Sequence, residues 1–316
     1  MKHKKYLCFS SKVSLIMYII LILYYVFCWY NVLIIHDGKR NQQWDKEHYY
    51  ACTDYLLTNV NSKKQEIVST YNYLGINAEI CKDITQYGVL PNSSFNIFSE
   101  FFAEENFLFP FFIPVIVLLP FIYLISKESK NKMVKNYILR NKYDEYIKYI
   151  FSMAYKNIFT IPVIVLITFL ISYILSGGNI NPKADIGMHY ILPNISFLNN
   201  PLFIPIYILT LFLGVGLYIN IGLIILSKNK NFIVSILESE LVIFLVWAFV
   251  FIIFGNIFKH IGVNSSNFNL LSIYEWEEIN NMYLYFALNL LLFILSYFVA
   301  KYSFKNKEKL ILMCEK

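Results

Sequence analysis

Charged residues are scarce in this chain of 316 residues. They make up 15% of the sequence, while 57% of the residues are hydrophobic, and an average soluble domain carries about 25% charged residues. This composition excludes a disordered chain and argues against a soluble enzyme. A nucleic-acid-binding protein is not expected either, because the net charge of +6 comes from strips of lysine beside apolar runs.

Motifs for catalysis and metal binding are also missing. The five cysteines form no CxxC pair, and the sequence contains neither HExxH nor the GxxxxGK[ST] of a P-loop ATPase. The pairs Glu104-Glu105 and Glu277-Glu278 lack the downstream Arg and intramembrane His of a glutamate-type intramembrane protease. The stretch Leu175–Gly178 spells the start of an ABC ATPase signature, but we interpret its two glycines as a helix C-cap. We therefore expect no enzymatic activity, no metal and no cofactor.

Long apolar runs dominate what is present. Each run has 19 to 27 residues, which at 1.5 Å per residue can cross a hydrocarbon core of about 30 Å. The first run follows four lysines, yet it is longer than a signal-peptide core and no cleavage site follows, so we interpret it as a retained anchor. The sequence predicts an all-α, polytopic membrane protein with six transmembrane helices at residues 13–35, 107–126, 158–176, 202–226, 232–258 and 282–300.

Basic residues alternate across these predicted spans. The N-terminus, loops 127–157 and 227–231 and the C-terminus hold 19 Lys and Arg over 64 residues, and the other three loops hold 8 over 119. Acidic residues run the opposite way, with 5 in the first set of loops and 14 in the second. Because positive loops stay in the cytoplasm, we expect both termini inside a bacterial cell membrane.

Residues 36–106 form the largest predicted extracytoplasmic segment, between the first two spans. No Gly or Pro falls between Gly38 and Gly75, and apolar residues recur there at roughly helical spacing. We expect a small, mainly helical domain that either caps the membrane or recognises a ligand directly. Cys52 and Cys81 lie in this segment and could pair if it is extracellular.

Residues 127–157 form the main predicted cytoplasmic segment of the domain that spans 107–316. It has no Gly or Pro, and basic residues surround two apolar faces, one near Tyr137 and Ile138 and one near Tyr146. A basic amphipathic helix of this kind can rest on anionic membrane lipid. It can equally dock in a groove on a cytoplasmic partner.

Three polar residues stand out inside the spans. Glu238 and Glu240 are the only acids in any apolar run, and Asn220 lies within the fourth run. Ionisable groups in a membrane usually face a bundle interior or water. Glu238 and Glu240 could snorkel or pair with Lys228 or Lys230, or they could serve a polar pathway or a subunit contact. Helix–helix hydrogen bonding is the expected role of Asn220.

The cytoplasmic segment carries a family resemblance. Ser126–Arg140 (SKESKNKMVKNYILR) resembles the turn and hydrophobic-Lys helix that follow the second span of ABC-2-type permeases, with Lys132-Met133 in place of the usual Gly-Thr. Arg140–Lys148 (RNKYDEYIK) is similar to the family's next pattern, with Asn141-Lys142 in place of Ser-Arg. Asn199-Asn200-Pro201 before the fourth span and the order of spans along nearly the whole chain agree with this resemblance.

The resemblance implies a permease subunit of an ABC transporter, an exporter of a peptide, lipid-like or antimicrobial compound. In that family two permease subunits pair as a homo- or heterodimer, and separate cytoplasmic ATPase subunits hydrolyse ATP. The helix after the second span couples the two parts, which here implies the residues Glu128, Val134, Lys135, Tyr137, Ile138, Arg140, Lys142 and Tyr146. The alternative is a stand-alone immunity or sensor protein whose extracytoplasmic segment binds a ligand.

Overall fold

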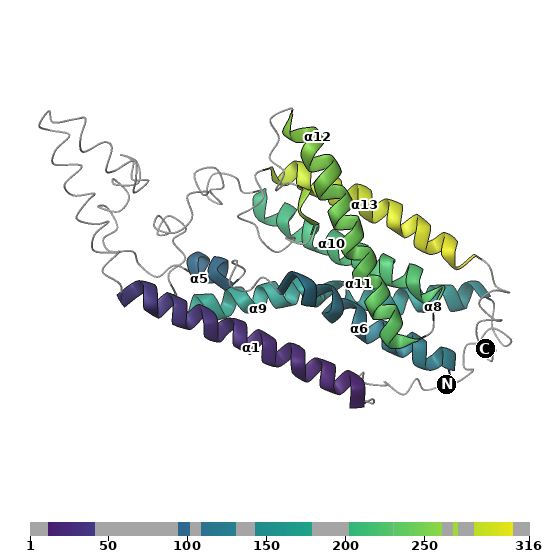
Figure 1. Cartoon of the computed structure of the whole chain (residues 1–316), viewed down its shortest axis with the longest axis horizontal. Coiled ribbons are helices and arrows are strands. Elements are labelled where there is room, and N and C mark those ends of the chain that lie inside the picture. The colour runs from purple at the N-terminus through teal and green to yellow at the C-terminus, as the bar shows by residue number, and fades with distance from the viewer. Residues whose placement is uncertain are drawn as a thin grey trace, which may run out of the picture. The chain divides into compact units, whose positions relative to one another are not determined.

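The computed structural model describes residues 12–41, 94–101, 109–130, 143–178, 202–229, 231–260, 268–270 and 281–305, and all regular structure within these ranges is helical. Most of the segment 36–106 lies outside them, including Cys52, Cys81 and the helices expected after Gly38. The helices appear in Figure 1 and are α1 (Lys12–Asn41), α5 (Ser94–Phe101), α6 (Phe109–Lys130), α8 (Tyr143–Tyr155), the 3-10 turn η3 (Lys156–Phe159), α9 (Thr160–Leu175), α10 (Phe203–Leu226), α11 (Phe232–Phe249), the π-helical turn η6 (Val250–Phe254), α12 (Gly255–Lys259) and α13 (Met282–Ser303).

Five helical segments are long and apolar enough to cross a membrane. They are residues 111–129, 143–175, 204–226, 232–259 and 282–303. This confirms an all-helical, multi-pass membrane protein in the described part of the chain. The first predicted span, residues 13–35, coincides with α1, whose described apolar stretch, residues 18–33, is shorter than the other five, so the six-span topology stays a prediction.

The second of these segments, residues 143–175, is longer than the span predicted at residues 158–176. Hydropathy alone places its start at residue 158, but helix already begins at Tyr143 and runs through η3 into α9. The first part, α8, is the amphipathic stretch expected at the end of the cytoplasmic segment. The structure therefore joins an amphipathic helix directly to an apolar helix, with a single 3-10 turn between them.

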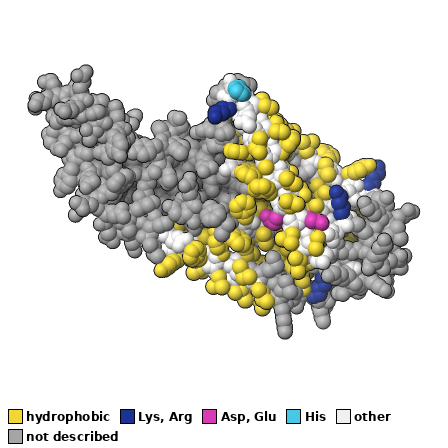
Figure 2. All heavy atoms as spheres, viewed as in Figure 1, with side chains coloured by type: hydrophobic (Ala, Val, Ile, Leu, Met, Phe, Trp, Pro, Cys, Tyr) yellow, Lys and Arg dark blue, Asp and Glu magenta, His cyan; other side chains and the backbone are white. Residues whose placement is uncertain are grey.

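The chain forms two compact units, and two of the four boundaries between them fall within α1 and α9. The larger contains residues 1–24, 107–165 and 201–316, and α10 is at its centre, packed against α6, α11 and α13. Within the apolar stretch of α10 72% of the residues are buried, against 17% in those of α11 and α13. The outer faces of these helices carry exposed apolar side chains, and on the face shown in Figure 2 basic side chains lie at the rim of the hydrophobic surface.

Glycine lets α10 approach its neighbours closely. A Cβ built on Gly216 would lie 2.5 Å from the Phe293 ring of α13, and one on Gly222 would lie 2.6 Å from Leu118 of α6. Any larger residue would therefore push these helices apart. Gly216 and Gly222 therefore have a structural role, since they permit close helix–helix contact.

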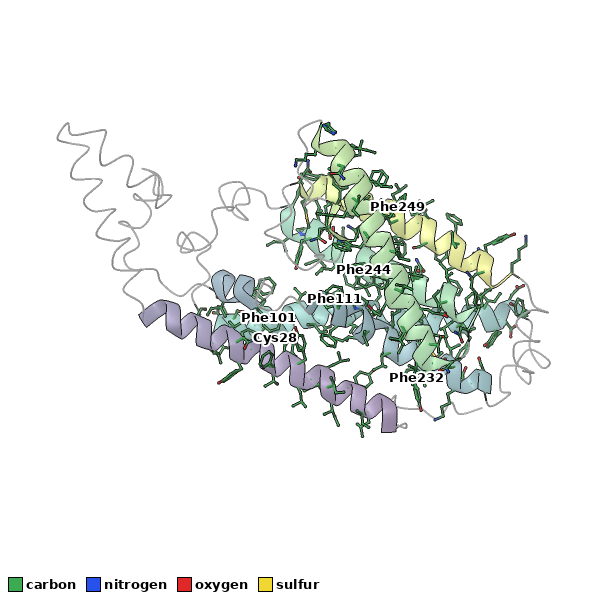
Figure 3. All side chains as sticks on the ribbon, in the orientation of Figure 1. Cys28, Phe101, Phe111, Phe232, Phe244 and Phe249 are labelled. Atoms are coloured by element: carbon green, nitrogen blue, oxygen red, sulfur yellow. The ribbon has the colours of Figure 1, made fainter. Side chains whose placement is uncertain are left out.

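The smaller unit contains residues 25–106 and 166–200. Its described core joins the later part of α1 to α5 and α9. Phe101 of α5 packs on Trp29 of α1, with 4.8 Å between their ring centroids. Cys28, which precedes Trp29, is fully buried, and Figure 3 labels both Cys28 and Phe101. The Tyr25 hydroxyl lies 2.9 Å from Thr168 Oγ1. The helix that precedes α6 is thus anchored on two apolar helices.

The end of α9 confirms that the glycines of Leu175–Gly178 form a helix C-cap. Gly177 and Gly178 have φ values of 68° and 86°, and their amides donate to the carbonyls of Ile174 and Tyr173. These are the left-handed conformation and hydrogen bonds of a helix C-cap.

Candidate functional site

Three tyrosines tie α8 to three different parts of the larger unit. The Tyr143 hydroxyl donates to the carbonyl of Phe304, just after α13, at 2.5 Å. The Tyr149 hydroxyl donates to Glu128 Oε1 of α6 at 2.7 Å, and the Tyr155 hydroxyl donates to Asn220 Oδ1 of α10 at 2.7 Å.

The spacing of these tyrosines explains why each reaches a different neighbour. They are six residues apart, and at about 100° per residue successive members leave the helix in directions about 120° apart. A helix with a tyrosine in each of three directions can bond three surrounding elements. A movement of α8 must therefore carry those elements with it or break the bonds.

The remaining side chains of α8 divide into two faces. Tyr146, Ile150 and Ala154 are buried, with 2%, 1% and 0% of their surfaces exposed. Asp144, Glu145 and Lys148 are exposed on the other side. The helix thus presents charge outward while its apolar face packs against the bundle.

The structure describes the side chains of two of the predicted coupling residues. Glu128, near the C-terminal end of α6, is the acceptor for Tyr149, and Tyr146 is buried one turn earlier in α8. The other six lie outside the described residues, namely Val134, Lys135, Tyr137, Ile138, Arg140 and Lys142. Their part in coupling stays a prediction.

Asn220 is the centre of a buried polar cluster. It is fully buried, accepts from Tyr155 and donates through Nδ2 to Ser296 Oγ of α13 at 3.0 Å. Ser296 donates in turn to the carbonyl of Phe293. Asn220 therefore makes the helix–helix hydrogen bonds expected of a polar residue in a span, and these bonds join α8, α10 and α13.

The two intramembrane acids have different surroundings. Glu238 Oε1 accepts a hydrogen bond from Asn229 Nδ2 at 3.3 Å. Asn229 lies in the sequence between Lys228 and Lys230, the two partners that the sequence suggested. Glu240 Oε1 is buried and has no hydrogen-bond partner. Figure 2 shows acidic side chains within the hydrophobic face of the described part. Among the described residues, no three His, Cys, Asp or Glu side chains gather as a metal site would require.

The structure also reveals a site that the sequence did not suggest. Residues 268–270, between α12 and α13, are held by donors from three helices: Trp247 Nε1 donates to Asn269 Oδ1 at 2.7 Å, Tyr285 to the Asn269 carbonyl at 3.0 Å and Tyr218 to the Leu270 carbonyl at 3.2 Å. Phe268 and Leu270 are each 2% exposed. An Asn in a predicted loop gives no sign that it enters the bundle.

Comparison with protein-family models, curated proteins and solved structures finds no match to this sequence. The site must therefore be interpreted from its own geometry. That geometry is an amphipathic helix bonded to three parts of an apolar helical bundle, with a buried polar cluster at its C-terminal end.

Proposed function

We propose that the chain is the permease subunit of an ATP-binding cassette exporter, driven by a separate cytoplasmic ATPase. The observation that carries this proposal is the three-way attachment of α8 through Tyr143, Tyr149 and Tyr155. A machine that converts work done in the cytoplasm into movement of membrane helices needs such a connection, and α8 meets α6, α10 and the end of α13 at once.

In this proposal the ATPase binds the segment that precedes α8. When the ATPase subunits close on ATP, they push residues 127–142 and with them α8. The shift is passed to α6 through Glu128, to α10 through Asn220 and directly along the chain into α9. Access would then alternate along the interface of two permease subunits, and the ATP chemistry would belong to the partner.

The apolar side chains near residue 137 would hold the contact, while the lysines around them would set specificity and encounter rate. Replacing Tyr137 and Ile138 with Asp would place unpaired carboxylates in the docking groove, at several kcal/mol each. The variant should still insert, because the spans are untouched, but it should lose its partner. The matched change, Lys130 and Lys132 to Gln, should weaken binding less, and its effect should shrink at high salt.

The experiment is affinity purification of the tagged chain from its own host in mild detergent, followed by mass spectrometry. We expect a protein with a P-loop to accompany the natural chain and to be lost from the double Asp variant. If the double Asp variant retains that protein, the coupling segment is misassigned. Contact of this segment with membrane lipid is then the better interpretation. If the chain purifies alone, the stand-alone immunity or sensor protein is the better account.

A further inference from the structure

Glu240 lies on α11 at the edge between its packed face and its exposed apolar face. It is eight residues from the start of α11, which places it about 12 Å along the helix, before the Phe244 labelled in Figure 3. Its neighbours one turn away differ in exposure: Ile236 and Ile243 are buried, whereas Leu237 and Phe244 are exposed. The carboxyl group therefore sits where the packed face of α11 meets its lipid-facing side.

No hydrogen-bond donor serves the buried oxygen of this carboxyl group. Glu240 Oε1 is fully buried and unpartnered, whereas Glu238 two residues earlier accepts from Asn229. The nearby hydroxyl of Tyr218 interacts electrostatically with Glu240, but it gives its single proton to the carbonyl of Leu270. Tyr218 therefore cannot serve as the donor.

Among the described residues, no positive charge faces Glu240 from α10 or α6, the two helices packed on α11. Helix α10 has no charged residue, and the charged residues of α6 all follow Tyr123 in the sequence. Tyr123 itself packs on Phe232 at the start of α11, with 5.4 Å between ring centroids. Lys127 lies over the Tyr123 ring and Glu128 bonds Tyr149, so both are at the far end from Glu240.

If the carboxyl group were ionised, its buried Oε1 would have no hydrogen-bond donor, and the helices packed on α11 would offer it no counter-charge. Such burial costs several kcal/mol, and a bound proton removes the charge that causes the cost. We propose that Glu240 is a proton-binding site within the membrane, where the side chain holds one proton in the folded protein and releases it reversibly. This inference does not rest on the permease proposal and holds with or without an ATPase partner.

The test is reaction with a lipophilic carbodiimide, N,N′-dicyclohexylcarbodiimide, in the full chain embedded in lipid. A protonated carboxyl adds across one C=N bond: its oxygen bonds to the central carbon and its proton moves to nitrogen. The O-acylisourea then rearranges to a stable N-acylurea, so the peptide gains the mass of one whole reagent and nothing leaves. Because the reagent dissolves in the bilayer, it can reach a carboxyl group at the lipid-facing edge.

Peptide mapping of the natural sequence should place the label on Glu240 and not on Glu238. Labelling should be highest at acidic pH and, once the carboxyl ionises, fall about tenfold for each further pH unit. A water-soluble carbodiimide should label Glu240 far less. Glu240→Gln should abolish the label, and the matched control Glu238→Gln should keep it.

Three outcomes would overturn the proposal: no label on Glu240 in the folded protein, equal labelling of Glu238 and Glu240, or labelling of Glu240 that does not fall as the pH rises. The mapping is done on the unaltered chain, so the result does not depend on whether a variant folds.

Discussion

Tyrosine hydroxyls make many of the long-range polar bonds of the larger unit. Tyr143, Tyr149 and Tyr155 tie α8 to its neighbours, and Tyr218 and Tyr285 hold residues 269 and 270. Tyrosine suits this task because its ring packs among apolar side chains while its hydroxyl reaches a carbonyl or amide several ångströms away. A bundle with few charges is thus fixed by single hydrogen bonds.

The bond between Tyr155 and Asn220 should have a measurable coupling energy. Tyr155→Phe keeps the ring and removes the donor to the buried Oδ1 of Asn220, and we expect a double-mutant cycle with Asn220→Ala to give about 0.6 and at most about 1.7 kcal/mol. Thermal unfolding in detergent measures it. Tyr155→Phe with Ser296→Ala serves as a second cycle, because Ser296 bonds the other end of the same amide. Additive effects in the first cycle would show that the bond contributes nothing.

Single residues were only partly predictable from sequence. Asn220, Glu238 and Glu240 are conspicuous in the sequence because polar groups are rare in apolar runs. The residues that surround them in the structure cannot be identified in the same way. Ser296 is 76 positions from Asn220, and only the packing of α10 on α13 brings them together. Tyr143 and Tyr155 are two of 26 tyrosines, and nothing local distinguishes them from the rest.

At the scale of helices, the hydropathy pattern located the described apolar segments well, since burial in a bilayer depends on length and composition. It failed where helix continues without apolar character. Helix α8 extends the third predicted span back to Tyr143, because its buried face packs on the bundle. Average hydropathy along the sequence does not detect such packing. Residues 268–270 enter the bundle for a similar reason, since donors from distant helices satisfy their backbone.

The close approach of α10 and α13 depends on Gly216. Gly216→Ala would place a methyl group 2.5 Å from the Phe293 ring, and we expect a loss of about 1–3 kcal/mol of stability from overpacking. Phe293→Leu should restore most of this loss by making room, while costing some stability by itself. Unfolding midpoints of both single variants and of the double variant provide the measurement. A Gly216→Ala variant as stable as the natural protein would contradict the close contact.

At the scale of the whole molecule, the charge asymmetry predicts which loops face the cytoplasm. In a variant without native cysteines, we expect cysteines introduced at Lys63 and Lys183 to react with an impermeant maleimide added to intact cells, and one at Lys130 to react only after the cells are opened. The reason is the excess of lysine and arginine in alternate loops. Labelling at position 130 in intact cells would contradict the predicted topology. It would also contradict the prediction that the first helix crosses the membrane and brings the number of spans to six.

The most direct test of the permease account is the ATP hydrolysis rate of the purified particle that contains this chain, reconstituted in lipid. The account predicts steady hydrolysis that accompanies the chain through purification. Tyr137→Asp with Ile138→Asp should abolish it, and Lys130→Gln with Lys132→Gln should reduce it only in part. A fully assembled particle that hydrolyses no ATP, or one whose hydrolysis is unchanged by the double Asp variant, would contradict the account.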